Sequence, residues 1–213
     1  SRTPELIGRA TCYLAIIFPI PSITIAMITI VYCHPQTESF NRMILNYVTG
    51  CLENEGRSYD VIDLYADNFN PVLSADDLKH YAKGLSTDPL VKRYTEVLQK
   101  TTEIIFIFPI WWGMMPAILK GFIDKTFLKG IIYDTTPEGA LMPCLAIDKT
   151  ILITTSEADS ELFGNFMMGY FNPMVLANVG MTNTQWLNFD HSSQKTDKDR
   201  NDFLSEILKV VAV

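Results

Sequence analysis

The chain has 213 residues, a formal net charge of −7, and 48% hydrophobic against 19% charged residues. This length fits one domain with a full core, and the acidic balance argues against nucleic acid or anionic lipid as a partner, because both are negatively charged. The four cysteines form no CxxC pair and the three histidines lie far apart, so we expect reduced thiols in a cytoplasmic protein, and no metal site.

Residues 1–26 differ in character from the rest of the chain. Basic residues precede an apolar run, as in a secretory signal, whereas Pro19 and Pro21 would break the helix of a membrane anchor. The third interpretation is an expression leader or upstream translation, with Met27 as the natural start. We favour it because the domain pattern is complete over 27–213; the alternative is an extra strand or extension that packs on the domain.

From Met27 onward, apolar runs and helical periodicity alternate along the chain. Strands are predicted over 27–33, 58–65, 103–108, 149–155 and 182–189. Helices are predicted over 43–56, 88–100, 116–127, 163–179 and 197–211, and a further helix is predicted to begin at residue 74. A long loop with room for a short hairpin fills 130–148. This alternation predicts an α/β fold with a five-stranded parallel sheet covered by helices on both faces.

In such a sheet, ligands bind beyond the carboxyl ends of the strands, here the loops 34–41, 109–115 and 155–163. The first loop leads into a helix start with Ser39 and Asn41, where free N–H groups and the helix dipole favour an anion. Ordinary capping by Ser39 is the alternative.

The second loop places Trp111 and Trp112 directly after the central strand. A flat aromatic ligand would cover these indoles, and the alternative is that they pack on the domain or on a dimer partner. The third loop, 154–157, offers backbone and hydroxyl donors at the same edge, although a plain strand-to-helix turn has the same composition.

Three segments together resemble the flavodoxin-like NAD(P)H:quinone oxidoreductase family. They are FPIWWGMMPAILKGFIDKTF over 108–127, HPQTESFN over 34–41, and the pair Thr154 and Thr155. The likeness covers about residues 27–189. It implies a flavodoxin-like three-layer sandwich with strand order 2-1-3-4-5, a non-covalent FMN or FAD, NAD(P)H as co-substrate, and a homodimer with the active site at its interface.

The resemblance also assigns residues to the cofactor. It implies that the flavin phosphate or pyrophosphate is held by His34, Ser39, Phe40 and Asn41. It implies that the isoalloxazine is lined by Pro109, Ile110, Trp111, Trp112 and Gly113. Thr154 and Thr155 would contact the polar edge of the ring, and Asp124 would lie near the cofactor.

The sequence departs from the family after its third loop begins. The family commonly continues with two glycines, where this chain has Ser156 and Glu157. The Tyr and His that assist hydride transfer in related quinone reductases fall at Leu162 and Met168, which cannot share a proton. Tyr170 and Tyr133 are the candidate substitutes.

The expected function is therefore a flavin-dependent NAD(P)H oxidoreductase that reduces quinones or similar small acceptors by two-electron, ping-pong hydride transfer. One alternative is a flavodoxin-type electron carrier, which the acidic charge permits. Another is a regulatory flavin-binding subunit of a membrane ion-transport system, which would have a membrane protein as its partner.

Overall fold

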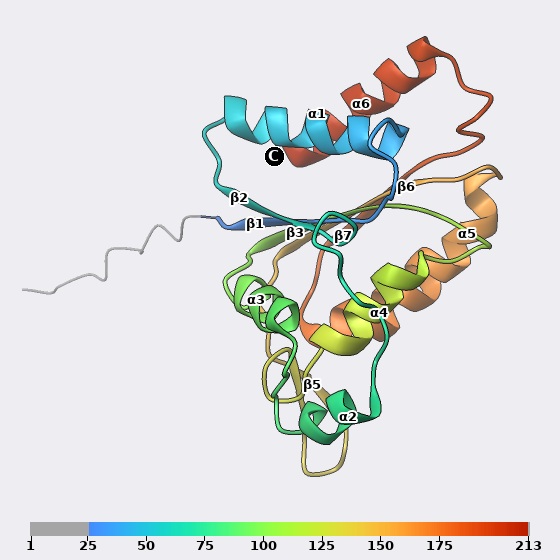
Figure 1. Ribbon diagram of the computed structural model, residues 1–213. Coiled ribbons are helices and arrows are strands. Elements are labelled where there is room, and N and C mark those ends of the chain that lie inside the picture. The colour runs from blue at the N-terminus through green and yellow to red at the C-terminus, as the bar shows by residue number, and fades with distance from the viewer. Residues whose placement is uncertain (1–25, 213) are drawn as a thin grey trace, which may run out of the picture.

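The computed structural model describes residues 26–212, and almost all of the expected N-terminal extension lies outside this range. A five-stranded parallel sheet forms the centre of the molecule (Figure 1). Its strands are β1 (Ile28–Tyr32), β2 (Tyr59–Asp63), β3 (Glu103–Pro109), β6 (Lys149–Thr155) and β7 (Thr184–Phe189). They lie in the order β2-β1-β3-β6-β7. The predicted order 2-1-3-4-5, counted over the strands of this sheet, is confirmed.

Helices cover both faces of the sheet (Figure 1). On one face lie α1 (Phe40–Asn54) and α6 (Asp197–Val211); on the other lie α3 (Pro89–Leu98), α4 (Ala117–Thr126) and α5 (Ser160–Phe166). Successive strand residues point to opposite faces, so Ile30 and Val31 are both fully buried but belong to separate core clusters. A strand covered on both faces needs apolar residues throughout, which explains the unbroken apolar runs in the sequence.

A smaller part of the chain extends from the helical layer formed by α3 and α4 (Figure 1). It contains α2 (Ala75–Tyr81), capped by Ser74, and the antiparallel hairpin of β4 (Tyr133–Thr135) and β5 (Leu141–Pro143). The loop over 130–148 therefore does contain a short hairpin. Among residues 26–212, every helix is too short or too polar to cross a bilayer.

The helix predicted over 163–179 is built from three parts. After α5, residues Met167–Leu176 form a π-helix, and Ala177–Val179 form a 3₁₀ turn. Pro173 lies inside the π-helix. Proline has no N–H and its ring clashes with the carbonyl four residues earlier, so a regular α-helix cannot continue through it. The wider π turn accommodates this residue.

Gly121 fixes how closely α4 approaches the loop before α2. A Cβ at this position would lie 2.3 Å from both the Cβ and the carbonyl oxygen of Pro71. Glycine normally weakens a helix interior, so its presence here reflects the close contact. The absence of a side chain at Gly121 therefore lets the loop that contains Pro71 pack directly on α4.

Candidate functional site

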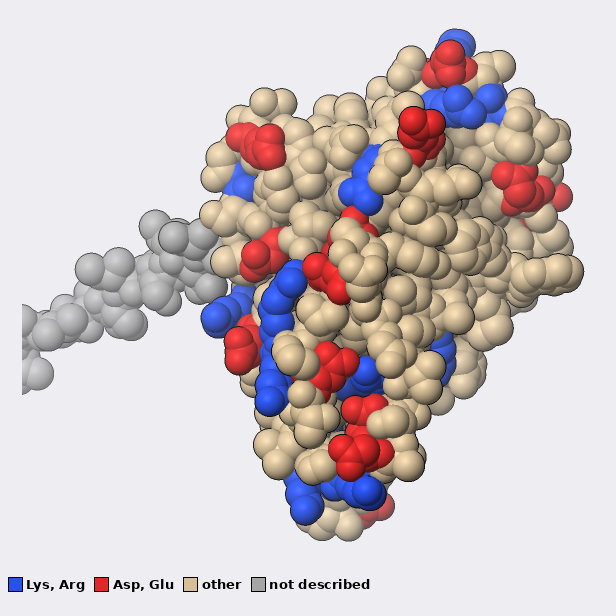
Figure 2. Space-filling model, in the orientation of Figure 1, with Lys and Arg blue, Asp and Glu red and all other residues tan. Residues whose placement is uncertain are grey.

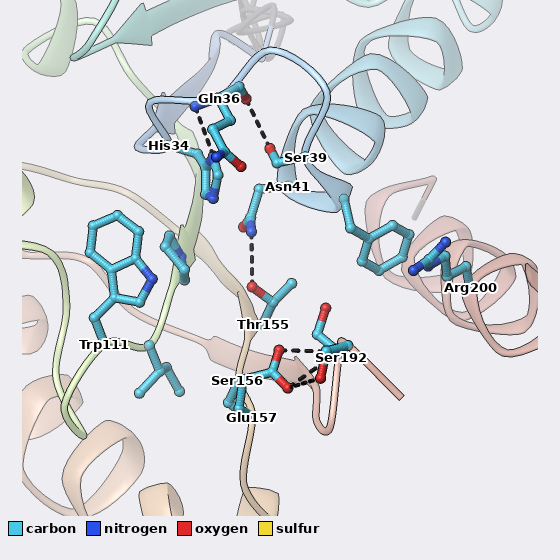
Figure 3. A pocket seen from close by; sticks show the side chains of 14 residues that line it. His34, Gln36, Ser39, Asn41, Trp111, Thr155, Ser156, Glu157, Ser192 and Arg200 are labelled. Atoms are coloured by element: carbon cyan, nitrogen blue, oxygen red, sulfur yellow. Dashed lines mark hydrogen bonds between the residues drawn. The ribbon is translucent and has the colours of Figure 1, made fainter. Parts of the chain in front are cut away.

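A cavity of about 300 Å³ opens where the carboxyl ends of the parallel strands meet (Figure 3). β1 and β3 are neighbours in the sheet, but the chain leaves β1 toward one edge and β3 toward the other. This reversal of strand order separates the following loops and leaves a crevice between them. The cavity is lined by His34, Gln36, Ser39, Phe40, Asn41, Pro109, Ile110, Trp111, Thr155, Ser156, Glu157, Ser192, Ser193 and Arg200.

The first loop forms a turn that begins α1. The Ser39 hydroxyl accepts the Arg42 N–H at 3.2 Å and donates to the Gln36 carbonyl at 3.0 Å. The Gln36 N–H in turn donates to His34 Nδ1 at 3.1 Å, so Nε2 is the nitrogen that can donate to a ligand. Burial lowers the pKa of His34, which favours the neutral ring at pH 7. Ser39 does cap the helix, and the first N–H groups of α1, which have no partner within the helix, belong to Phe40 and Asn41, which line the cavity.

Asn41 ties the first loop to the third. It is buried, and its Nδ2 donates to the Thr155 hydroxyl at 2.8 Å (Figure 3). Its Oδ1 is also buried and has no partner within residues 26–212. A buried acceptor without a donor is costly. A ligand hydroxyl or N–H in this cavity would satisfy it.

Arg200 brings a positive charge to the same cavity from the second turn of α6. Its guanidinium lies 5.8 Å from the Phe40 ring centroid, and one terminal nitrogen donates to Asp197 at 3.2 Å. In the described part of the chain, its buried Nε has no acceptor. Together with the start of α1, Arg200 makes this end of the cavity suited to an anion.

The second loop is a tight turn beside the cavity. The Ile110 N–H donates to the Thr155 carbonyl at 2.7 Å, and Trp111 and Met114 exchange backbone hydrogen bonds. Between them, Trp112 and Gly113 have φ values of 52° and 76°. Such angles are uncommon for a bulky residue, and here they turn the fully exposed Trp112 away while Trp111 lines the cavity.

Several residues implied by the resemblance lie outside the cavity, including Trp112 and Gly113. The hydroxyl of Thr154 faces the neighbouring strand, where it donates to Asn188 at 2.7 Å and accepts the Trp186 indole N–H at 2.9 Å. Asp124 lies on α4 and pairs with Lys120 at 2.5 Å.

The two candidate tyrosines also lie elsewhere. Tyr133 is in the β4–β5 hairpin, its ring centroid 6.5 Å from that of Tyr81. Tyr170 is an exposed residue of the π-helix and lines a separate apolar cavity of about 210 Å³ beside α4. Leu162 is exposed on α5, and Met168 packs against the core. Within residues 26–212, the structure brings neither tyrosine to the larger cavity.

Six lining residues were not among the predicted site residues: Gln36, Ser156, Glu157, Ser192, Ser193 and Arg200. Ser192 and Ser193 follow β7, the fifth strand, whose carboxyl end lies at the same edge of the sheet. The rule that selected the other loops applies equally to this one and could have found them. Arg200 is a surface-type residue in a charged helix, and nothing local in the sequence distinguishes it from its neighbours.

Comparison with known proteins places these features in context. A family model described as flavodoxin-like fold matches residues 26–211. An uncharacterized NAD(P)H oxidoreductase of Haemophilus influenzae is 34% identical over 107 residues, covering 50% of this chain and 52% of the relative. A ribosyldihydronicotinamide dehydrogenase [quinone] of Pongo abelii is 34% identical over 125 residues, covering 50% and 53%. The chain thus spans about half the length of the curated relatives it matches.

A solved structure gives a longer match. The NAD(P)H:quinone oxidoreductase from Methanothermobacter marburgensis superposes with a TM-score of 0.74 at 25% sequence identity, covering 87% of this chain and 97% of that protein. The match therefore extends over most of this chain.

Proposed function

The chain belongs to the flavodoxin-like fold family, and on that premise we propose that it is a flavin-dependent NAD(P)H oxidoreductase that reduces quinones or similar small acceptors. The observation that carries the proposal is the cavity at the carboxyl ends of the strands. It combines a helix start and Arg200 at one end with the Trp111 indole at the other. The names of the relatives above point to the same class of reaction.

The residues present fit a flavin. Ser39, Phe40 and Arg200 would hold its phosphate, because they offer the helix N-terminus and a guanidinium with an unpartnered buried Nε in the described chain. Asn41 would accept a hydroxyl of the ribityl chain at its unpartnered Oδ1, and His34 would donate from Nε2.

The remaining lining residues suit the ring system. Pro109, Ile110 and Trp111 give an apolar wall, and Thr155 and Ser156 add polar groups next to it, since Thr155 pairs with Pro109 in the sheet. The resemblance also implies Trp112, Gly113, Thr154 and Asp124. We propose that Thr154 acts indirectly, because its hydroxyl anchors β6 to β7, and that Trp112 and Gly113 shape the turn that positions Trp111.

A bound flavin supplies the hydride chemistry, and the protein supplies binding and orientation. NAD(P)H and the acceptor would use the open side of the cavity in turn, which gives ping-pong kinetics. The wall formed by Ile110 and Trp111 would exclude water from that place. No side chain of the cavity has to form a covalent bond with the substrate in this scheme.

A homodimer fits the surface beside the cavity. Figure 2 shows an uncharged area over α4 and α5. Met114 and Tyr170 line the apolar cavity beside α4. Trp112, Met114 and Tyr170 are all exposed. A second copy of the chain would cover these residues and enclose the acceptor site from the open side.

The test begins with the absorption spectrum of the purified protein, followed by release of the cofactor and chromatography, which separates FMN from FAD. Anaerobic addition of NADH or NADPH should then bleach the flavin absorption, and a quinone should restore it. A folded, colourless protein that takes up neither FMN nor FAD would overturn the proposal. Bound flavin without turnover would favour the electron carrier or the regulatory subunit.

A further inference from the structure

Glu157 places a carboxylate in the wall of the cavity. It is the second residue after β6 and lines the cavity together with Thr155 and Ser156. The Ser193 N–H donates to its two oxygens at 3.1 and 3.2 Å, and the Ser193 hydroxyl donates at 2.6 Å. Three contacts from Ser193 therefore hold the carboxylate in this position.

The charge of Glu157 is not neutralised by a neighbouring cation. Within the described range, the Glu157 carboxylate forms no ion pair with a lysine or arginine, and the hydrogen bonds that it accepts come from Ser193. Arg200 lies on α6, on the other side of Thr155 and Ser192 in Figure 3. The cavity is therefore polarised, with its cation beside the start of α1 and its anion beside the third loop.

We propose that Glu157 lowers the reduction potential of the flavin bound in this cavity, by holding a negative charge beside the polar edge of its ring. This inference rests on the proposed function. Uptake of two electrons and one proton by the neutral ring leaves one negative charge on it. A fixed carboxylate repels that charge, so the protein binds the oxidised form more tightly than the reduced form.

A bound flavin ring would itself shield the Glu157 carboxylate from water and so strengthen the repulsion. Glu157 is exposed in the structure, and water weakens the interaction between charges. A ring that covers the cavity removes part of that water on the side facing the carboxylate. The hydrogen bonds from Ser193 prevent the side chain from turning away, so the repulsion persists when the ligand is reduced.

The experiment compares E157Q with the wild type. The midpoint potential of bound flavin is measured by dye equilibration, and the dissociation constant of oxidised flavin by fluorescence quenching. We expect E157Q to favour the reduced form about tenfold relative to the oxidised form. For a two-electron couple, this ratio corresponds to a midpoint about 30 mV higher. The affinity for oxidised flavin should change little.

E161Q is the matched control, because Glu161 is an exposed carboxylate four residues along the chain that lies outside the cavity. Its midpoint should equal that of the wild type. E157A gives a second route to the same charge removal should E157Q fold poorly, as judged by thermal melting. In the wild type, high salt should raise the midpoint of bound flavin more than that of free flavin, because it screens the carboxylate.

The outcomes separate the two proposals. A wild type that binds no flavin overturns the proposed function. The role of Glu157 is overturned if the wild type binds flavin but the midpoint potential in E157Q or E157A equals that in E161Q, and salt shifts bound and free flavin equally. The proposed function would then still stand.

Discussion

At the residue scale, Arg200 offers a sharp test of the phosphate end of the cavity. R200Q removes the charge and keeps a side chain of similar length. Charge-assisted hydrogen bonds contribute about 1.5–3 kcal/mol, so we expect R200Q to weaken binding of FMN or FAD roughly tenfold to hundredfold. The control is K198Q, because Lys198 lies on the same helix and outside the cavity. Equal affinities for R200Q and K198Q, measured by fluorescence titration, would contradict the assignment.

His34 should make the stability of the protein depend on pH. Burial lowers its pKa below the ordinary value of about 6.5. As the pH falls through that value, His34 becomes protonated in the unfolded chain before it does so in the folded chain. The stabilising contribution is therefore complete above about pH 6.5 and is lost at lower pH.

H34N tests this dependence, because asparagine keeps an acceptor for the Gln36 N–H and does not titrate. Urea unfolding at about pH 7.5 and about pH 5.5 should show a smaller loss of unfolding free energy in H34N than in the wild type. The idea fails if the two proteins lose the same amount.

The cavity residues that the sequence predicted correctly are those that lie close to the ends of strands. Ser39, Asn41, Trp111 and Thr155 line the cavity because each lies within a few positions of a predicted strand or helix boundary. Arg200 is close to them only because α6 packs beside α1 on the sheet. That contact is a property of the fold, so no local pattern could have predicted it.

At the element scale, Gly121 in α4 and Gly50 in α1 should respond in opposite ways to alanine. G121A adds a methyl group 2.3 Å from Pro71, and overpacking of this kind costs about 1–3 kcal/mol. G50A in α1 meets nothing within 4 Å, so better helix propensity should stabilise the protein by about 0.5–1 kcal/mol. Urea unfolding of both variants measures the difference. A stable G121A would mean that Pro71 can move without cost.

The periodicity of apolar residues predicted the boundaries of most elements to within a few residues. It did not predict the type of helix in the segment formed by α5 and the π-helix. The apolar residues over 163–179 indicate a helix, but they do not reveal which carbonyl each N–H contacts. Pro173 signals a disturbance. Whether that disturbance becomes a kink, a break or a wider turn depends on the neighbours, such as Thr184, whose hydroxyl donates to Asn172 at 2.6 Å.

At the scale of the whole molecule, the parallel sheet was predictable because alternating strands and helices allow few topologies. Assembly is the property that remains to be measured. We expect light scattering to give about twice the 24.1 kDa of the single chain. W112E should lower the mass to that of one chain without lowering the melting temperature, because the side chain is fully exposed in the single chain.

The control for W112E is L78E, which charges another exposed apolar position, on α2. It should leave the mass unchanged. A wild type that is monomeric at all concentrations tested would rule out the homodimer, and equal masses for W112E and the wild type would place the interface elsewhere.

The three tryptophans of the chain lie in or next to segments that lead to the cavity. Trp111 lines the cavity, Trp112 occupies the adjacent turn, and Trp186 donates to Thr154 directly behind it. The ultraviolet emission of the native protein therefore originates almost wholly beside the cavity, with little background from distant parts of the fold. Any ligand that absorbs in the near ultraviolet should quench this emission by energy transfer, which gives an optical titration that needs no label.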